Sequence, residues 1–176
     1  MAGHNKFSKI KHQKAKNDGQ KSKIFGKLVR FIGVEAKKAG GNLKSPGLAL
    51  AIEKAKKENM PNDTIERAIK KATTDNSAQM ENITYESYGP GGVAILIEAL
   101  TDNRNKAAQE IKAILVKHGF ELASPGSASW AFTKGPEGLA PNMTMPLEDA
   151  DIEKLQSLVE ALEENDEVQE VFTNAE

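Results

Sequence analysis

Cysteine is absent from this chain of 176 residues, and arginine, histidine and tryptophan are scarce. Without cysteine the protein has no disulfide and no thiolate metal site, and a reducing compartment fits its composition. The longest apolar run, VAILIEAL at residues 93–100, is interrupted by Glu98 and is far too short to span a bilayer. The lysine-based start has no secretory h-region and differs from an Arg- and Ser-rich mitochondrial presequence. We therefore expect a cytoplasmic protein without a membrane partner.

Signatures of catalysis and metal binding are also missing. His4 and His12 are not at a metal-ligand spacing, and His118 falls in the last turn of an expected helix, where a cation is favoured anyway. The GPGG segment at residues 89–92 precedes a strand, so it lacks the helix N-terminus of a phosphate-binding loop. A turn is the expected structure there. We expect no catalytic residue, metal, cofactor or small-molecule substrate, and we expect that the protein is not an enzyme.

Charge is abundant but divided between the two halves of the chain. Residues 1–72 hold 18 Lys and Arg against 6 Asp and Glu, whereas residues 73–176 hold 6 against 19, so that the formal total is only −1. Such asymmetry favours a polyanionic partner for the basic half. The alternative is that the two halves attract each other, but a strongly basic segment would still expose positive potential on its far side.

The first 27 residues concentrate eight lysines against one aspartate. Such a segment repels itself in water, whereas phosphates allow it to release counterions and to fold. Lysine lacks the bidentate fork of arginine, so backbone contacts are favoured over base reading. Lysine runs also serve solubility, which is the alternative. The candidate nucleic-acid-binding residues are Lys6, Lys9, Lys11, His12, Lys14, Lys16, Lys21, Lys23, Lys27 and Arg30.

The basic half has the periodicity of three short amphipathic helices within residues 20–72. Gly40 and Gly41 end the first of them, and Ser45 followed by Pro46 is a start signal for the second. Asp63 and Glu66 have capping-box spacing at the start of the third helix. We expect a basic arm at residues 1–20, a helical domain at residues 21–74 and a linker at residues 75–82.

The acidic half changes to a strand period and predicts the order β-β-α-β-β-(β)-α-β over residues 83–176. In this interpretation two strands flank the turn at residues 124–126, with Ala128, Trp130 and Phe132 on one face. Residues 133–142, TKGPEGLAPN, form a loop, and MTMPL a short strand. The expected fold class is α+β: a three-helix domain with a basic arm, then a ferredoxin-like α/β sandwich with a mainly antiparallel sheet.

A second polar concentration, TDNRN at residues 101–105, lies at a strand-to-helix turn. Helix capping by Asp102 or Asn105 would explain part of it. Capping does not account for the whole set, and an exposed arginine on such a turn suits a contact surface. The possible contact loop consists of Asp102, Asn103, Arg104 and Asn105.

Four segments together resemble the YebC/PmpR family almost along the whole chain: MAGHNKFSKIKHQKAKNDGQKSKIFGKL, NMPNDTIERAIKKA, YESYGPGGVAILIEALTDNRN and GSASWAF. Members of this family are described as cytoplasmic transcriptional regulators that bind promoter DNA. The mitochondrial translational activator of cytochrome c oxidase belongs to the same family, and some bacterial members are regarded as ribosome-associated translation factors. The resemblance implies an N-terminal helical domain followed by α/β domains.

Two departures from the family pattern bear on function. Asn5 and Phe7 stand where the family usually has serine and tryptophan. Typical members are also longer and carry an additional α/β domain between the positions that match Phe132 and Met143, where this chain has only residues 133–142. We expect a regulator of gene expression that binds promoter DNA through the arm and the helical domain. The alternative is a translation factor that binds rRNA within the ribosome, and an enzyme is a distant third.

Overall fold

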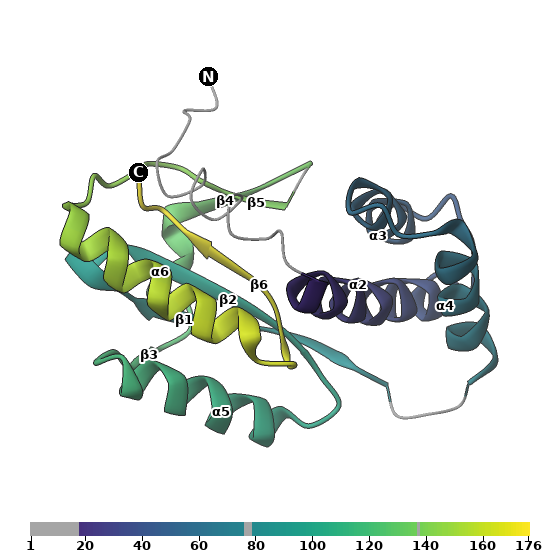
Figure 1. The fold of residues 1–176 in the computed structure, drawn as a ribbon, viewed down its shortest axis with the longest axis horizontal. Coiled ribbons are helices and arrows are strands. Elements are labelled where there is room, and N and C mark those ends of the chain that lie inside the picture. Colours follow the sequence, from purple (N-terminus) through teal and green to yellow (C-terminus); the bar gives the residue numbers. More distant parts are fainter. Residues whose placement is uncertain (1–17, 76–78, 137) are drawn as a thin grey trace. The chain divides into compact units, whose positions relative to one another are not determined.

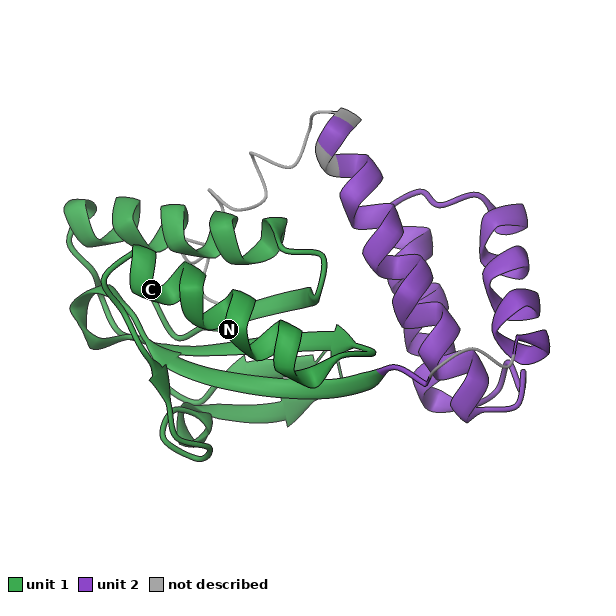
Figure 2. Cartoon of the chain, turned by 90° about the horizontal axis from the view of Figure 1, so that it is seen from below, with its two compact units in different colours: residues 1–15, 81–176 green, residues 16–80 purple. Residues whose placement is uncertain are grey.

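A computed structural model describes residues 18–75, 79–136 and 138–176 of the chain (Figure 1). The described residues divide into two compact units, one within residues 16–80 and one within residues 81–176 (Figure 2). The first unit is helical and the second combines helices with antiparallel sheets. The predicted α+β class is therefore confirmed.

Three helices make up the first unit: α2 (Asp18–Lys38), α3 (Pro46–Lys57) and α4 (Asn62–Thr74). Helix α2 packs against both of the others. Each helix contributes one apolar stripe to a shared core, as their amphipathic spacing predicts. The buried members of that core are Ile32, Ala36, Leu48, Ala51, Ala55, Met60, Ile65 and Ala68.

Glycine ends α2 as expected. Gly40 and Gly41 adopt φ values of 58° and 81°, and the Gly41 N–H donates to the Ala36 carbonyl at 2.9 Å. These are left-handed conformations that glycine adopts without steric cost, and they satisfy a carbonyl of the last turn.

The starts of α3 and α4 differ in part from the prediction. Ser45 does occupy the N-cap position of α3, but its side chain makes no capping hydrogen bond. The Glu35 carboxylate lies beside this helix start instead, since a Cβ at Gly47 would lie only 2.0 Å from Glu35 Oε2. A carboxylate is favoured there by the helix dipole. The predicted capping box of α4 is wrong, because Pro61 is the N-cap residue and Asp63 lies inside the first turn.

A four-stranded sheet forms the centre of the second unit. Its strand order is β3 (Leu122–Ala123), β1 (Glu81–Tyr88), β2 (Ala94–Thr101) and β6 (Val168–Thr173), and all neighbours are antiparallel. Strands β1 and β2 are joined across Gly89–Val93, a tight connection that includes a short 3₁₀ helix. The turn expected for GPGG is thus confirmed. This hairpin precedes the first connection in which a helix joins two strands of the sheet.

Helices α5 (Arg104–Lys117) and α6 (Asp149–Glu164) cover one face of this sheet (Figure 2). Alternate residues of β2, among them Ile95 and Ile97, pack against Ile111 and Leu115 of α5 and against three leucines of α6. Because β2 is buried on both faces except at the half-buried Glu98, its sequence is apolar over most of its length and shows no alternation.

The opposite face of the sheet contacts the segment between β3 and α6. Most of residues 133–142, predicted as a loop, belong instead to two antiparallel strands, β4 (Phe132–Gly135) and β5 (Gly138–Pro141). Phe132 packs with Leu96 of β2 and with Ala128 and Ala131 in a second core.

The strand predicted just before this hairpin is absent from the described structure. Residues 129–131 form a 3₁₀ turn, and the Trp130 side chain is exposed, so the prediction that Ala128, Trp130 and Phe132 share one strand face is wrong. The predicted strand MTMPL is reduced to a single parallel bridge between Met145 and Ala175.

Candidate nucleic-acid interface

The predicted basic residues are only partly covered by the described structure. Lys21 and Lys23 lie on the first turns of α2 and are exposed, whereas Lys27 and Arg30 further along the helix are half-buried. The predictions for Lys6, Lys9, Lys11, His12, Lys14 and Lys16 lie outside the described residues. The structure thus places four of the ten candidates, all of them on one helix.

Further exposed lysines lie at the ends of the other helices of this unit. Lys56 and Lys57 end α3, and Lys70 and Lys71 precede the end of α4; all four are exposed. Sequence reasoning counted them in the basic half without singling them out. Part of their role is local, since cations favour helix C-termini, and Lys57 lies 3.3 Å from Glu53. In residues 18–75 thirteen lysines and arginines still outnumber seven acidic residues.

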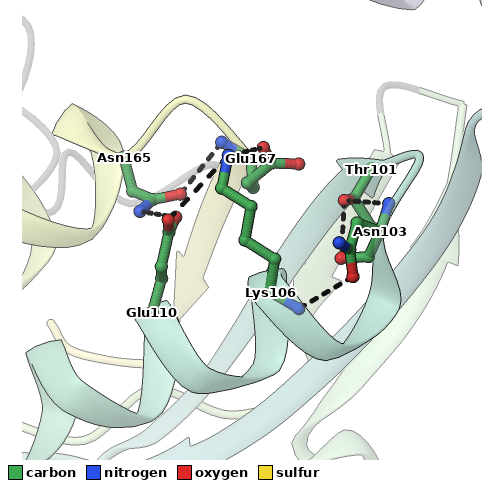
Figure 3. A network of polar contacts seen from close by, with 6 residues as sticks. All are labelled: Thr101, Asn103, Lys106, Glu110, Asn165 and Glu167. Atoms are coloured by element: carbon green, nitrogen blue, oxygen red, sulfur yellow. Dashed lines mark hydrogen bonds and ion pairs between the residues drawn. The ribbon is translucent and has the colours of Figure 1, made fainter.

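The β2–α5 turn, predicted as a contact loop, is tied together by its own side chains (Figure 3). The buried Thr101 hydroxyl accepts a hydrogen bond from the Asn103 N–H at 2.9 Å. Asn103 is the N-cap of α5, because its side-chain oxygen accepts the Lys106 N–H at 3.1 Å. The capping residue is therefore Asn103, and not Asp102 or Asn105 as predicted.

Lys106 links this turn to the connection between α6 and β6. Its ammonium group lies 3.2 Å from the buried Glu167 carboxylate and 3.9 Å from Glu110. Asn165 donates to Glu110 at 2.8 Å and accepts the Glu167 N–H at 2.9 Å (Figure 3). The hydrogen bond to Glu167, followed by the charges of Glu167 and Glu110, raises the pKa of Lys106.

Sequence reasoning missed this network, and the only local signal for it was the spacing of four between Lys106 and Glu110. Its contacts join the β2–α5 turn to the connection between α6 and β6, so its evident role is to hold these two loops together.

The remaining residues of the turn are exposed. Arg104 donates to the Glu81 carboxylate at 3.0 Å, and the two side chains retain 69% and 57% of their accessible surface. An ion pair of this exposure contributes at most about 1 kcal/mol to stability and leaves the guanidinium accessible. Asp102 and Asn105 are exposed beside it.

Within residues 18–75, 79–136 and 138–176, no three His, Asp or Glu side chains come together as metal ligands. Over the same residues, no helix is both long enough and apolar enough to cross a membrane.

Comparison with known proteins identifies the chain. A family model described as "TACO1/YebC protein N-terminal domain" matches residues 5–75, and one described as "TACO1/YebC second and third domain" matches residues 80–136 and 137–175. The chain belongs to the TACO1/YebC family. The predicted YebC/PmpR resemblance is thereby confirmed. The family is one of non-enzymatic regulatory proteins, as expected for this chain.

Relatives in this family are named as regulators. A "Probable transcriptional regulatory protein" of Fervidobacterium nodosum is 38% identical over 235 residues, covering 99% of this chain and 93% of that protein. A protein of the same name from Petrotoga mobilis is 44% identical over 184 residues, covering 100% of this chain and 71% of its own length. The crystal structure of the conserved hypothetical protein Aq1575 from Aquifex aeolicus superposes with a TM-score of 0.79 at 33% identity, covering 95% of both chains.

This chain is a short TACO1/YebC member. The alignment with the Fervidobacterium protein runs over 235 positions although this chain has 176 residues, so the relative contains internal residues that this chain lacks. The match to the second and third domains is divided into residues 80–136 and 137–175, and this division falls between the ends of β4 and β5 in the sequence.

Proposed function

We propose that this TACO1/YebC protein regulates transcription by binding DNA through the lysine-rich arm of residues 1–20 and the helical domain that follows it. The observation that supports this most strongly is the charge division, +12 in residues 1–72 against −13 in residues 73–176. The exposed lysines of α2, α3 and α4 extend the positive charge of the arm over the helical unit. This function belongs in the cytoplasm.

The kind of basic residue favours contact with the phosphate backbone. The whole chain has only three arginines, of which Arg30 is half-buried and Arg104 lies in the acidic half. Bidentate reading of guanine in the major groove depends largely on arginine, whereas lysine acts on phosphate as a point charge. Binding through lysine positions a protein on nucleic acid without reading much sequence.

In this proposal the acidic unit orients the protein on the nucleic acid. Its negative charge disfavours extended contact with phosphates, so the phosphate contacts come from the basic half. The exposed residues Asp102, Arg104 and Asn105 of the β2–α5 turn suit a contact with a protein partner.

Crosslinking in cells, followed by sequencing of bound DNA and RNA together, tests the proposal. DNA, promoter regions included, should be recovered with the wild type and recovered much less with Lys9→Ala/Lys11→Ala. The control is Lys112→Ala/Lys117→Ala, which removes two exposed lysines of α5 and should retain binding. Enrichment of neither DNA nor RNA would contradict nucleic-acid binding.

Ribosomal RNA is the second candidate target, because lysine contacts to a phosphate backbone suit RNA equally well. In the same experiment, selective recovery of ribosomal RNA through the arm lysines would make the protein a ribosome-associated translation factor. Promoter DNA would then be absent from the recovered sequences.

A further inference from the structure

The single tryptophan of the chain is exposed and held in place. Trp130 retains 58% of its accessible surface although it lies between two buried alanines. Its indole Nε1 donates to the Ser127 carbonyl at 2.8 Å and contacts the Tyr88 hydroxyl at 3.2 Å. The Tyr88 hydroxyl also donates to the Ser127 carbonyl, and Tyr88 itself is 38% exposed. The polar edge of the indole is thus satisfied internally while much of its surface stays open.

A buried carboxylate holds the loop that carries this side chain. Glu86 of β1 is 6% exposed and accepts hydrogen bonds from the N–H groups of Gly126, Ala128 and Ser129. Bonds of a backbone N–H to an ionised carboxylate are stronger than neutral ones. The Glu86 side chain therefore holds this loop in one conformation before any ligand binds.

The hairpin holds the other side of Trp130. Asn142, just after β5, donates from its side chain to the Trp130 carbonyl at 2.8 Å, and its N–H donates to the Ala131 carbonyl at 2.8 Å. The Thr133 hydroxyl donates to the Asn142 side-chain oxygen. Backbone and side chain of Trp130 are therefore both anchored, so a ligand that contacts the indole orders little that is not already ordered.

Few charged residues lie close to Trp130 in the sequence, although this half of the chain is acidic. Residues 122–147 contain two of them, Lys134 and Glu137, and the buried carboxylate of Glu86 is occupied by the N–H groups of the loop. Ser129 and Asn142 are exposed, and so are two apolar side chains, Tyr88 in contact with the indole and Met143 next to Asn142 in the chain. An apolar peptide would require a larger contiguous hydrophobic patch, whereas a planar π system needs only the face of the ring.

We propose that Trp130, with Tyr88 beside it, is a platform on which one unpaired base of a single-stranded nucleic acid stacks. This rests on the proposed function, which makes a nucleic acid the ligand of this chain. Stacking on an aromatic side chain is tolerant of sequence, and a base inside a duplex does not offer its face. The platform makes single strands, or unpaired segments within a structured nucleic acid, the preferred ligands.

Intrinsic fluorescence tests the platform directly, since all tryptophan emission comes from Trp130. The full chain is titrated with 12-nucleotide single-stranded RNA, single-stranded DNA of the same sequence and the corresponding duplex, and binding is followed in parallel by anisotropy of a labelled strand. We expect single strands to quench the emission to saturation and the duplex to bind without quenching. The comparison of RNA with DNA shows which of the two nucleic acids provides the stacked base.

Two substitutions complete the experiment. Trp130→Ala should weaken single-strand binding about 5- to 150-fold and leave duplex binding unchanged, the range that loss of one stacked base produces. Trp130→Phe retains a ring and should keep most of the affinity, which separates stacking from damage to the loop.

The outcomes distinguish the platform from the proposed function. Binding that depends on arm lysines, with unquenched Trp130 emission or with equal affinities for Trp130→Ala and wild type, would overturn the platform alone. Binding of single strands that quenches Trp130 but is unaffected by Lys9→Ala/Lys11→Ala would overturn docking through the arm and would support the platform. Absence of binding to all three nucleic acids would overturn both.

Discussion

At the residue scale, a few polar side chains hold the loops of the α+β unit in place. Glu86 accepts three backbone N–H groups of the loop before β4, and Asn103 caps α5. Each of these bonds joins a loop to a regular element. Removing a buried partner such as Glu86 costs more than the net gain from the bond, because the groups left behind are unpaired and shielded from water.

The Glu86 carboxylate should make the stability of this unit depend on pH. Burial alone would raise its pKa, but the hydrogen bonds from Gly126, Ala128 and Ser129 outweigh burial and hold the pKa below its ordinary value. The ionised form is therefore favoured in the folded state. Its contribution is complete above the ordinary carboxyl pKa of about 4.3 and is lost as pH falls through the lower folded-state pKa.

Urea unfolding followed by Trp130 emission checks this prediction. At pH 7, Glu86→Gln should lower the free energy of unfolding by about 1–3 kcal/mol, because an amide group then faces the three donors. The difference from wild type should shrink below about pH 4.3. A difference that stays constant down to pH 3, or that grows on acidification, would contradict the role given to Glu86.

The cap of α5 yields a second prediction. Asn103→Ala should lower the free energy of unfolding by about 1 kcal/mol, whereas Asn103→Asp should retain the cap. Asn105→Ala is the matched control, since this neighbouring asparagine is exposed and should change stability by less than about 0.5 kcal/mol. Equal losses from both alanine variants, measured by urea unfolding, would show that Asn103 is not the important cap.

At the element scale, the sequence correctly predicts the helices and strands whose positions follow from local apolar periodicity. The three N-terminal helices, the β1–β2 hairpin and helices α5 and α6 all follow from apolar spacing and from glycine or proline at their ends. The segment around Trp130 was predicted wrongly because its conformation depends on Glu86, some forty residues upstream. Strand periodicity in SASWAF indicated a strand, but a long-range carboxylate determines the turn.

The candidate interface was predictable to a similar degree. The charge division is visible in the sequence, and so is the arginine of the β2–α5 turn. The capping role of Asn103 rather than Asp102 was not, because it depends on where the helix begins. The pairing of Lys106 with Glu167 joins residues 61 positions apart and has no local signal.

The arm is the element on which the proposed function depends. Helix α2 begins at Asp18, and the preceding residues contain few apolar side chains. Deleting residues 1–17 should therefore leave the thermal unfolding midpoint unchanged and remove most of the nucleic-acid affinity. Calorimetry and a binding titration of the shortened chain check both halves of this prediction. Unchanged affinity would contradict it, and so would loss of cooperative unfolding.

At the scale of the whole molecule, this TACO1/YebC protein separates positive from negative charge along one chain. The basic half carries lysines at high density, and the acidic half carries the exposed Trp130 just before β4. In this account phosphate contacts supply affinity and a stacked base adds a preference for single strands. Such binding recognises little of the nucleotide sequence.

The salt dependence of binding tests this account most directly. If the arm and the helical domain neutralise on the order of six phosphates, log K against log salt should fall with a slope of about −5 on duplex DNA and less steeply on single strands. Each arm Lys→Ala change should reduce the slope by about one and weaken all sequences alike. The measurement is a salt series on a candidate promoter, random duplex, single strands and purified ribosomes. A preference for the promoter of about 10³-fold that survives raised salt would contradict backbone docking and show operator recognition.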